Sequence, residues 1–335
     1  MRLNALLSIA VLLHLISGAP TSADDRTSIS LGAGTAVRDL LDEMPEPVAL
    51  FGLSESSLAL VAGKESEKAN RLFLTSGATS PKLTSEVPIH LFLACFGDNV
   101  QAATAAEYAF GTLSARSVSV LYDDGHTYTN LLQGYFSEAF GNLGGEIASL
   151  VPFQGPENFA EAIGKVKDAD VLFLAAETPQ GALGMVTELR ANGFSQPIIG
   201  GDGYDGENVW QQNPDISDVY YTTHAYFGPS VKTGPAAVFS KQYAEAYQGQ
   251  RPNGFAGLGY DAVGLLASAI ERAGSTDPDA VLLALSNTKS YAGVTGTISY
   301  LNGDHVPVKT VTLMKITSGE PVFVEKIFPE TVPKP

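Results

Sequence analysis

The sequence of 335 residues has a single cysteine, so the chain cannot close an internal disulfide and its stability must come from its core. Cys95 lies in the apolar stretch 91–96, where we expect a buried small side chain rather than a nucleophile. The five histidines are scattered, without the spacing of a metal site, at His14, His90, His126, His224 and His305. We therefore expect neither a disulfide nor a metal site.

Basic residues are also scarce. The chain has 20 Lys and Arg against 36 Asp and Glu, which gives a formal net charge of −16. Binding to nucleic acid needs clustered Lys and Arg to neutralise phosphates, so this composition argues against a nucleic-acid partner. The acidic residues form no run of like charge, which is typical of a solvated surface.

Motifs of common enzyme classes are missing. The sequence has no G-x-S-x-G nucleophile elbow, no P-loop, no H-E-x-x-H and no complete dinucleotide fingerprint. Gly32-Ala33-Gly34 precedes a helical pattern but lacks the third glycine of a nucleotide-binding loop. We expect a protein that is not an enzyme and that needs no cofactor.

The only strongly apolar segment of some length is at the N-terminus. It covers residues 5–16, follows Arg2, and leads to the small residues 21–23 just before Asp24. This pattern predicts a secretory signal peptide over residues 1–23, because such peptides have a basic start, a short apolar stretch and small residues at the cleavage site. The protein is then expected to be periplasmic. The run is too short to span a bilayer comfortably. A buried first helix is the alternative.

Short apolar runs alternate with longer amphipathic segments along most of the chain. We expect strands at 48–51, 72–75, 118–122, 171–174 and 219–221. We expect helices at 56–69, 99–113, 129–143, 160–167 and 181–191. The strands are largely apolar throughout rather than alternating, as strands covered on both faces should be. This order predicts βαβ units and parallel sheets.

The final third follows a different pattern. Three helical segments at 235–248, 258–273 and 278–286 come in succession, before β-like runs at 297–300 and 311–316. Without the leader roughly 310 residues remain, which is more than one compact core usually holds. We therefore expect two lobes.

Several segments resemble the type I periplasmic binding proteins, specifically the leucine/isoleucine/valine-binding branch. They are the strand and serine-bearing turn 48–57, the segment 75–83, the strand 119–124 leading to Tyr128, and the segments 198–203, 259–263 and 293–296. The resemblance covers residues 28–325, with the motifs in the family's order and spacing. It implies an α/β fold of two doubly wound parallel-sheet lobes joined by hinge strands.

One departure from the family concerns the start of the chain. The family normally places a strand, a long helix and a second strand before the strand that resembles 48–51. Here only a short run at 28–31 and a helical pattern at 35–44 precede it, so a first βα unit is missing. We expect an incomplete sheet or a more open pocket. By resemblance, the lobes are 26–117 with 228–305, and 118–227 with 306–328.

An amino acid carries a carboxylate, which hydroxyls and backbone N–H groups can bind. Ser56 falls where a helical pattern begins, and a helix N-terminus supplies free N–H donors and a positive dipole end. Thr79 follows Gly77, whose missing side chain lets a ligand approach the backbone. The resemblance implies that Ser56 and Thr79 hold the α-carboxylate, with Gly77 beside them. Helix capping and turn formation are the alternatives.

The ammonium group of an amino acid needs an acid. Asp202 lies between two glycines after an apolar strand, where open α/β sheets place ligand groups. The resemblance implies that it takes the ammonium; an ordinary turn aspartate is the alternative. Tyr128 matches an aromatic residue that closes over the ligand, or it is a core tyrosine. Glu177 would favour a cationic or polyamine-like ligand, hydrogen-bond a polar side chain, or lie in an exposed loop. Tyr204 is a further candidate for the pocket wall.

The resemblance thus implies an extracytoplasmic solute-binding protein of an ABC transporter. We expect it to capture an amino acid or an amino-acid-like solute in the cleft between its lobes and to deliver it to a membrane permease. The alternative is a degenerate, sensory or accessory module that binds a ligand without feeding a transporter.

Overall fold

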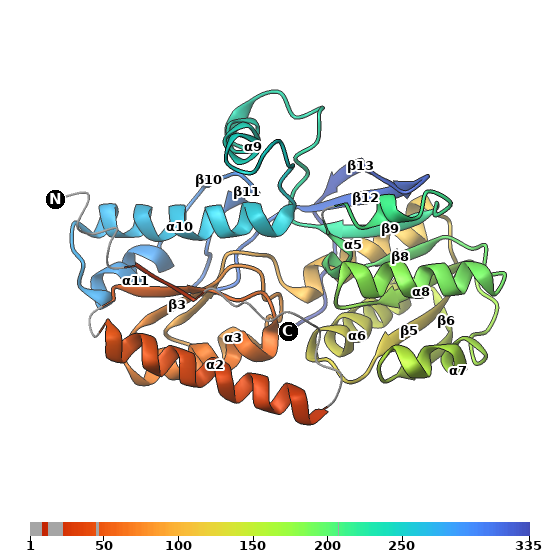
Figure 1. Cartoon of the computed structure of the whole chain (residues 1–335), viewed down its shortest axis with the longest axis horizontal. Coiled ribbons are helices and arrows are strands. Elements are labelled where there is room, and N and C mark those ends of the chain that lie inside the picture. Colours follow the sequence, from red (N-terminus) through yellow and green to blue (C-terminus); the bar gives the residue numbers. More distant parts are fainter. Residues whose placement is uncertain (1–8, 13–22, 45–46, 207) are drawn as a thin grey trace. The chain divides into compact units, whose positions relative to one another are not determined.

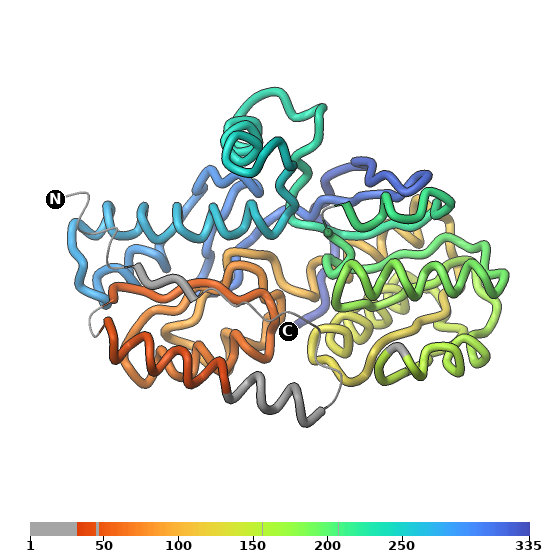
Figure 2. Tube along the Cα trace, in the orientation of Figure 1, coloured from red at the N-terminus to blue at the C-terminus, as the bar shows by residue number. Residues whose placement is uncertain are grey.

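The computed structural model describes residues 9–12, 23–44, 47–206 and 208–335. Two compact units of α/β architecture make up the chain (Figure 1), and segments far apart in the sequence belong to the same unit (Figure 2). Unit 1 comprises Met1–Phe96, Thr233–Phe239 and Phe255–Lys309, and unit 2 comprises Gly97–Lys232, Ser240–Gly254 and Thr310–Pro335.

Unit 1 contains a parallel four-stranded sheet. Its strands lie in the order β1 (Ile9–Leu12), β2 (Ala49–Gly52), β3 (Leu72–Thr75) and β4 (Leu91–Leu93). The helices of this unit are α2 (Ala23–Glu43), α3 (Ser56–Lys68), α4 (Leu83–Glu86), α11 (Pro278–Ser286) and nearly all of α10 (Gly254–Ala273). A two-stranded antiparallel hairpin consists of β10 (Tyr291–Gly293) and β11 (Gly296–Ile298).

Both faces of the sheet in unit 1 are buried. Along β2, Leu50 packs into one hydrophobic cluster with α2 and α3, whereas Ala49 and Phe51 pack into another with α10 and α11. Because successive strand side chains point to opposite faces, a strand covered on both sides must be apolar at every position. This explains the continuous apolar runs in the sequence.

Unit 2 contains a seven-stranded sheet, in the order β13-β12-β9-β8-β7-β5-β6. The strands from β9 to β6 are parallel, and β12 is antiparallel to both β9 and β13. Their bounds are β5 (Ser117–Asp123), β6 (Glu146–Phe153), β7 (Val171–Ala175), β8 (Ile198–Gly200), β9 (Val219–Thr223), β12 (Val311–Thr317) and β13 (Glu320–Ile327).

Helices cover both faces of this second sheet. One core cluster contains side chains of α5 (Asp98–Glu107) and α6 (Thr127–Asn142), and the other contains side chains of α7 (Phe159–Ile163) and α8 (Pro179–Ala191). Helix α9 (Gly234–Ala246) is divided between the two units after Phe239. A π-helical turn (Tyr108–Thr112) continues α5, and short 3₁₀ turns lie at Pro156–Asn158, Asp202–Tyr204 and Trp210–Gln212.

Local sequence signals explain where two of the helices begin. Thr178 accepts a hydrogen bond from the backbone N–H of Gly181 at the start of α8, and Asp277 accepts one from Ala280 at the start of α11. In both helices a proline follows the capping residue, where its missing N–H costs nothing.

The start of the chain differs from the prediction. Residues 28–31 lie within helix α2, not in a run of their own before a helix. Most of the predicted signal peptide, 1–23, lies outside the described residues, but Ile9–Leu12 form β1 and pair with β2 from Ile9↔Ala49 to Leu12↔Gly52. Part of the segment predicted to be a leader therefore forms the edge strand of this sheet, beside β2.

The division into units also differs from the predicted lobe boundaries. Residues 97–117, predicted in lobe 1, belong to unit 2 because the alanines of α5 pack into the same core as α6 and β5. Residues 306–309, predicted in lobe 2, belong to unit 1, where Lys309 Nζ donates to the Ala94 carbonyl at 3.0 Å. Among the described residues, no helix has the length and apolar character that a bilayer crossing requires.

Candidate ligand-binding residues

In unit 1, two loops that follow neighbouring strands are tied together at one edge of the sheet. Thr75, the last residue of β3, donates its hydroxyl to the Leu53 carbonyl after β2 at 2.7 Å. The same hydroxyl accepts the backbone N–H of Ala78 at 3.0 Å. Parallel strands end at the same edge, so this link places the turn before Ser56 and the turn containing Thr79 next to each other.

The side chains of Ser56 and Thr79 are buried hydroxyls in the two linked loops of unit 1. Both residues are buried, with 3% and 2% of their surface exposed. Neither side chain has a hydrogen-bond partner among the described residues, and neither is among the fully enclosed polar atoms that lack one. A buried hydroxyl normally has a partner, so two hydroxyls without one, on loops that are linked to each other, are typical of a site that binds a polar group.

The N-terminus of helix α3 is less open than the sequence suggests. Glu55 caps it: its carboxylate accepts the N–H groups of Ser57 at 3.0 Å and Leu58 at 2.8 Å, and also the Ser57 hydroxyl at 2.6 Å. The Glu55 carboxylate therefore accepts two of the N–H groups that we expected to be free for a ligand. In this turn, the Ser56 hydroxyl is the candidate donor to a ligand that remains.

We expect the substitution Glu55→Ala to lower the free energy of unfolding by about 1 kcal/mol, the usual effect of losing a helix cap. Urea denaturation measures the change. The matched control is Glu271→Ala, which removes an exposed acid from α10 in the same unit. Equal stabilities for the two variants would show that the cap contributes nothing.

Position 77 requires a glycine because neighbouring side chains of unit 1 leave no room for a Cβ atom. A Cβ atom at this position would lie 2.8 Å from the Phe255 ring and 2.8 Å from the Ser54 hydroxyl. The missing side chain of Gly77, which we predicted would let a ligand approach the backbone, also leaves room for the ring of Phe255 at the start of α10. Sequence reasoning missed Phe255, because nothing in the local pattern separates it from an ordinary helix residue.

In unit 2, Asp202 is the centre of a buried polar network. It follows β8, is 2% exposed, and its carboxylate accepts the Tyr128 hydroxyl at 2.7 Å and Gln101 Nε2 at 2.9 Å. His224 Nε2 lies 2.9 Å from the other carboxylate oxygen. The side-chain oxygen of Gln101, Oε1, accepts the N–H of Asp202 at 3.0 Å and the Thr222 hydroxyl at 2.8 Å.

The network sets the protonation states of its members. Burial opposes the charge of Asp202, but hydrogen bonds and charge from His224, with bonds from Tyr128 and Gln101, outweigh it and lower the pKa of the carboxyl group. Burial, with the nearby charge of Asp202, raises the pKa of Tyr128 well above its ordinary value. The carboxylate therefore stays ionised, and the tyrosine hydroxyl stays protonated and donates to it.

Asp202 and Tyr128, both predicted site residues, are thus brought together by direct contact. Sequence reasoning missed Gln101 and His224, which bind the same carboxylate from α5 and from the end of β9. His224 directly follows an apolar strand, which is the signal that could have found it. Gln101 carries no such signal, because it lies within a helix rich in alanine.

The other two predicted residues of unit 2 have separate environments. Glu177 pairs with His126 Nδ1, and His126 Nε2 lies 3.5 Å from Asp123. Tyr204 is completely buried, donates its hydroxyl to the Leu174 carbonyl at 2.8 Å, and packs beside Trp210. In this arrangement Tyr204 lies in the core of unit 2, whereas we considered it for the wall of the ligand pocket.

Comparison with known proteins places this chain in a family. The sequence model of the periplasmic binding protein family matches residues 21–321. The Leu/Ile/Val-binding protein BraC3 of Rhizobium johnstonii is 27% identical over 263 residues, which cover 76% of this chain and 69% of the relative. A Leu/Ile/Val-binding protein homolog of Brucella melitensis is 27% identical over 287 residues, 82% of this chain and 74% of the relative.

Solved structures agree with the sequence relatives. A leucine-binding protein of Thermotoga maritima matches with a TM-score of 0.80 and 25% identity, covering 90% of this chain and 85% of that one. A branched-chain amino acid transporter substrate-binding protein of Streptococcus pneumoniae, in complex with isoleucine, matches with a TM-score of 0.80 and 28% identity, over 90% and 84% of the two chains. The chain has the type I periplasmic binding protein fold and belongs to the periplasmic binding protein family, with Leu/Ile/Val-binding proteins among its relatives.

Proposed function

We propose that this protein is the periplasmic substrate-binding component of an ABC transporter, and that its solute is an amino acid or an amino-acid-like molecule. Its family and its Leu/Ile/Val-binding relatives support the general class. The observation that carries the proposal is that two buried hydroxyls of unit 1, Ser56 and Thr79, on loops linked through Thr75, have no partner among the described residues.

The chemistry of the hydroxyl pair suits a carboxylate. Each hydroxyl can donate one hydrogen bond, and bonds to an ionised acceptor are stronger than those between neutral groups. Both side chains are nearly buried, so little water competes with a bound carboxylate. The α-carboxylate of an amino acid fits this requirement.

For the ammonium group, we propose that the network around Asp202 acts mainly through Tyr128. The Asp202 carboxylate already accepts Tyr128 and Gln101 and contacts His224, so direct contact with a ligand would displace one of them. In this proposal Asp202 holds the Tyr128 hydroxyl in place. Glu177 would bind a cationic ligand only in competition with His126.

We expect Ser56→Ala and Thr79→Val each to weaken amino-acid binding about tenfold or more, the usual effect of losing one hydrogen bond to a charged group, about 1.5–3 kcal/mol. Isothermal titration with leucine, isoleucine, valine and polar amino acids measures the effect. Ser85→Ala is the control, because it removes an exposed hydroxyl from α4 in the same unit.

Two outcomes would change the proposal. If both variants bind as well as the unaltered protein, the hydroxyl pair is not part of the site. If the unaltered protein binds none of the amino acids tested, an accessory or sensory module that does not feed a transporter becomes the better description.

A further inference from the structure

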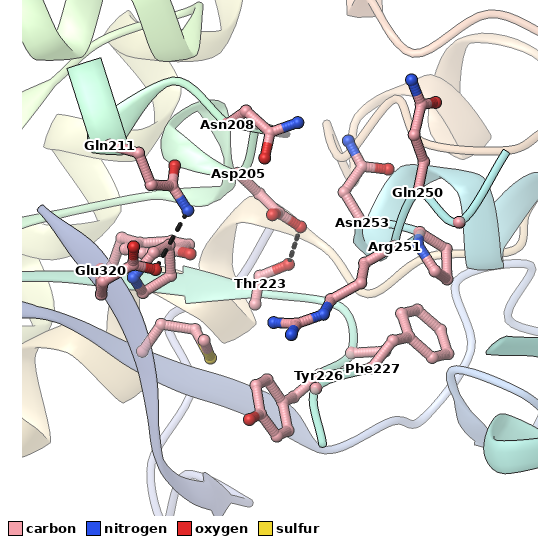
Figure 3. A pocket seen from close by; sticks show the side chains of 18 of the residues that line it. Asp205, Asn208, Gln211, Thr223, Tyr226, Phe227, Gln250, Arg251, Asn253 and Glu320 are labelled. Atoms are coloured by element: carbon pink, nitrogen blue, oxygen red, sulfur yellow. Dashed lines mark hydrogen bonds between the residues drawn. The ribbon is translucent and has the colours of Figure 1, made fainter. Parts of the chain in front are cut away.

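A cavity of about 520 Å³ lies within unit 2, and none of the predicted ligand residues lines it. Its volume is within the range of small-molecule sites in proteins. The lining residues come from the loop after Asp202, from β9 and the residues that follow it, from the loop 248–253, and from the β12–β13 hairpin (Figure 3). The cavity is therefore formed by residues of one unit alone.

The loop that forms one side of the cavity is held in place at both ends. At its beginning, Gln248 and Gly249 have φ values of 56° and 85°, and the N–H of Gly249 donates to the Ala244 carbonyl at 2.8 Å. At its end, the N–H of Gly254 donates to Asp205 Oδ2 at 2.8 Å. The Thr223 hydroxyl donates to the same Asp205 oxygen at 2.5 Å, which ties the loop to β9.

Arg251, an exposed residue of the loop, brings a positive charge to this cavity. Its side chain reaches from the loop into the space bounded by Thr223 and Tyr226 (Figure 3). It has no hydrogen bond or ion pair with any described residue. Among the described residues that line the cavity, the acids have donors: Asp205 accepts Thr223 and Gly254, and Glu320 accepts Gln211 Nε2 at 3.2 Å.

Apolar side chains line the cavity close to this guanidinium group. Phe227 is buried, and Tyr226 is half-buried with its ring 5.4 Å from that of Phe323. Met314 of β12 adds a further apolar surface. A guanidinium group binds a carboxylate through two parallel hydrogen bonds, and aromatic walls suit a flat apolar body.

From this geometry we propose that unit 2 contains a second binding site, centred on Arg251, for a small monocarboxylate with an apolar or aromatic body. Arg251 binds the carboxylate, and Tyr226, Phe227 and Met314 contact the apolar body. The site is separate from Ser56 and Thr79, and it does not depend on the proposed transport function.

Titration of the full chain with 4-fluorobenzoate, followed by ¹⁹F NMR, tests the proposal. We expect Arg251→Gln to weaken binding at least tenfold, and Arg251→Lys to weaken it less, because lysine keeps the charge but lacks the planar pair of donors. Lys326→Gln is the control: it removes an exposed positive charge from β13 of the same unit. We expect this control and Thr79→Val to bind as the unaltered protein does.

Three results would overturn the second site. They are no binding of 4-fluorobenzoate, phenylacetate or hexanoate at millimolar concentration, equal affinity of Arg251→Gln and the unaltered protein, or a loss of binding in Thr79→Val instead of Arg251→Gln. The last result would place the carboxylate at the hydroxyl pair of unit 1 and would leave the proposed function intact. Amino-acid titrations of Arg251→Gln separate the two proposals further, because we expect them to be unchanged.

Discussion

Replacing Asp202 by alanine is expected to lower the free energy of unfolding by about 3–5 kcal/mol, the usual effect of removing one member of a buried charged pair. The substitution leaves Tyr128, Gln101 and His224 facing a buried space without their common acceptor. In a unit of this size each kcal/mol shifts the melting temperature by roughly 2–4 °C, so we expect a decrease of roughly 6–20 °C. Differential scanning calorimetry measures it.

Two further variants define what Asp202 does. Asp202→Asn keeps the size and removes the charge, so we expect a smaller loss of stability than for alanine. Asp215→Asn, an exposed residue of the same unit, is the control and is expected to change little. If Asp202→Asn keeps its full stability but no longer binds amino acids, Asp202 contacts the ligand directly and our assignment to Tyr128 is wrong.

The same network predicts a dependence on pH. The pKa of Asp202 is lower in the folded chain than its ordinary value, so the unfolded chain binds more protons in this range. The stabilisation is complete above a pH of about 4, the ordinary range for aspartate, and it is lost as the pH falls through the lower folded value. We expect acid to destabilise the unaltered protein more steeply than Asp202→Asn, measured by urea denaturation between neutral and acid pH.

The second large effect is expected at Gly203, next to Asp202. A Cβ atom there would lie 2.1 Å from the Ala176 carbonyl oxygen and 3.0 Å from that of Glu177. These are backbone atoms, so the clash cannot be relieved by a change of rotamer. We expect Gly203→Ala to lower the free energy of unfolding by about 1–3 kcal/mol or more, in the range of overpacked cores, as measured by urea denaturation.

Gly184→Ala is a control for which we expect the opposite change, a higher free energy of unfolding. Gly184 lies in helix α8 of the same unit, is exposed, and has nothing within 4 Å of the position of an added Cβ. Alanine is a better helix former than glycine, so Gly184→Ala is expected to stabilise by about 0.5–1 kcal/mol. Equal effects at the two positions would mean that the backbone around Asp202 adapts without loss.

Much of the fold could be predicted from local patterns. The strand expected at 72–75 is β3 itself, and those expected at 118–122 and 171–174 lie within β5 and β7. These strands are largely apolar because both faces are covered, so their pattern is strong. Strand β13 was missed because it is exposed along much of its length and lacks such a pattern.

The candidate ligand residues were only partly predictable. Ser56, Thr79 and Asp202 could be singled out as candidates because each follows a strand, where α/β folds place polar groups. Their environments could not be foreseen. The cap by Glu55 and the burial of Tyr204 depend on side-chain directions and packing, and Gln101 lies 101 residues from the aspartate that it binds.

The sequence by itself determined the class of the protein: alternating apolar and amphipathic segments predicted parallel sheets, and ordered motifs indicated the family. The tertiary structure alone decided that Asp202 is enclosed by three side chains, that Arg251 faces a cavity, and that Ile9–Leu12 pair with β2. The reason is physical. Periodicity is a local property that each segment carries, whereas the partner of a buried charge or a strand edge is set by which distant segments pack together.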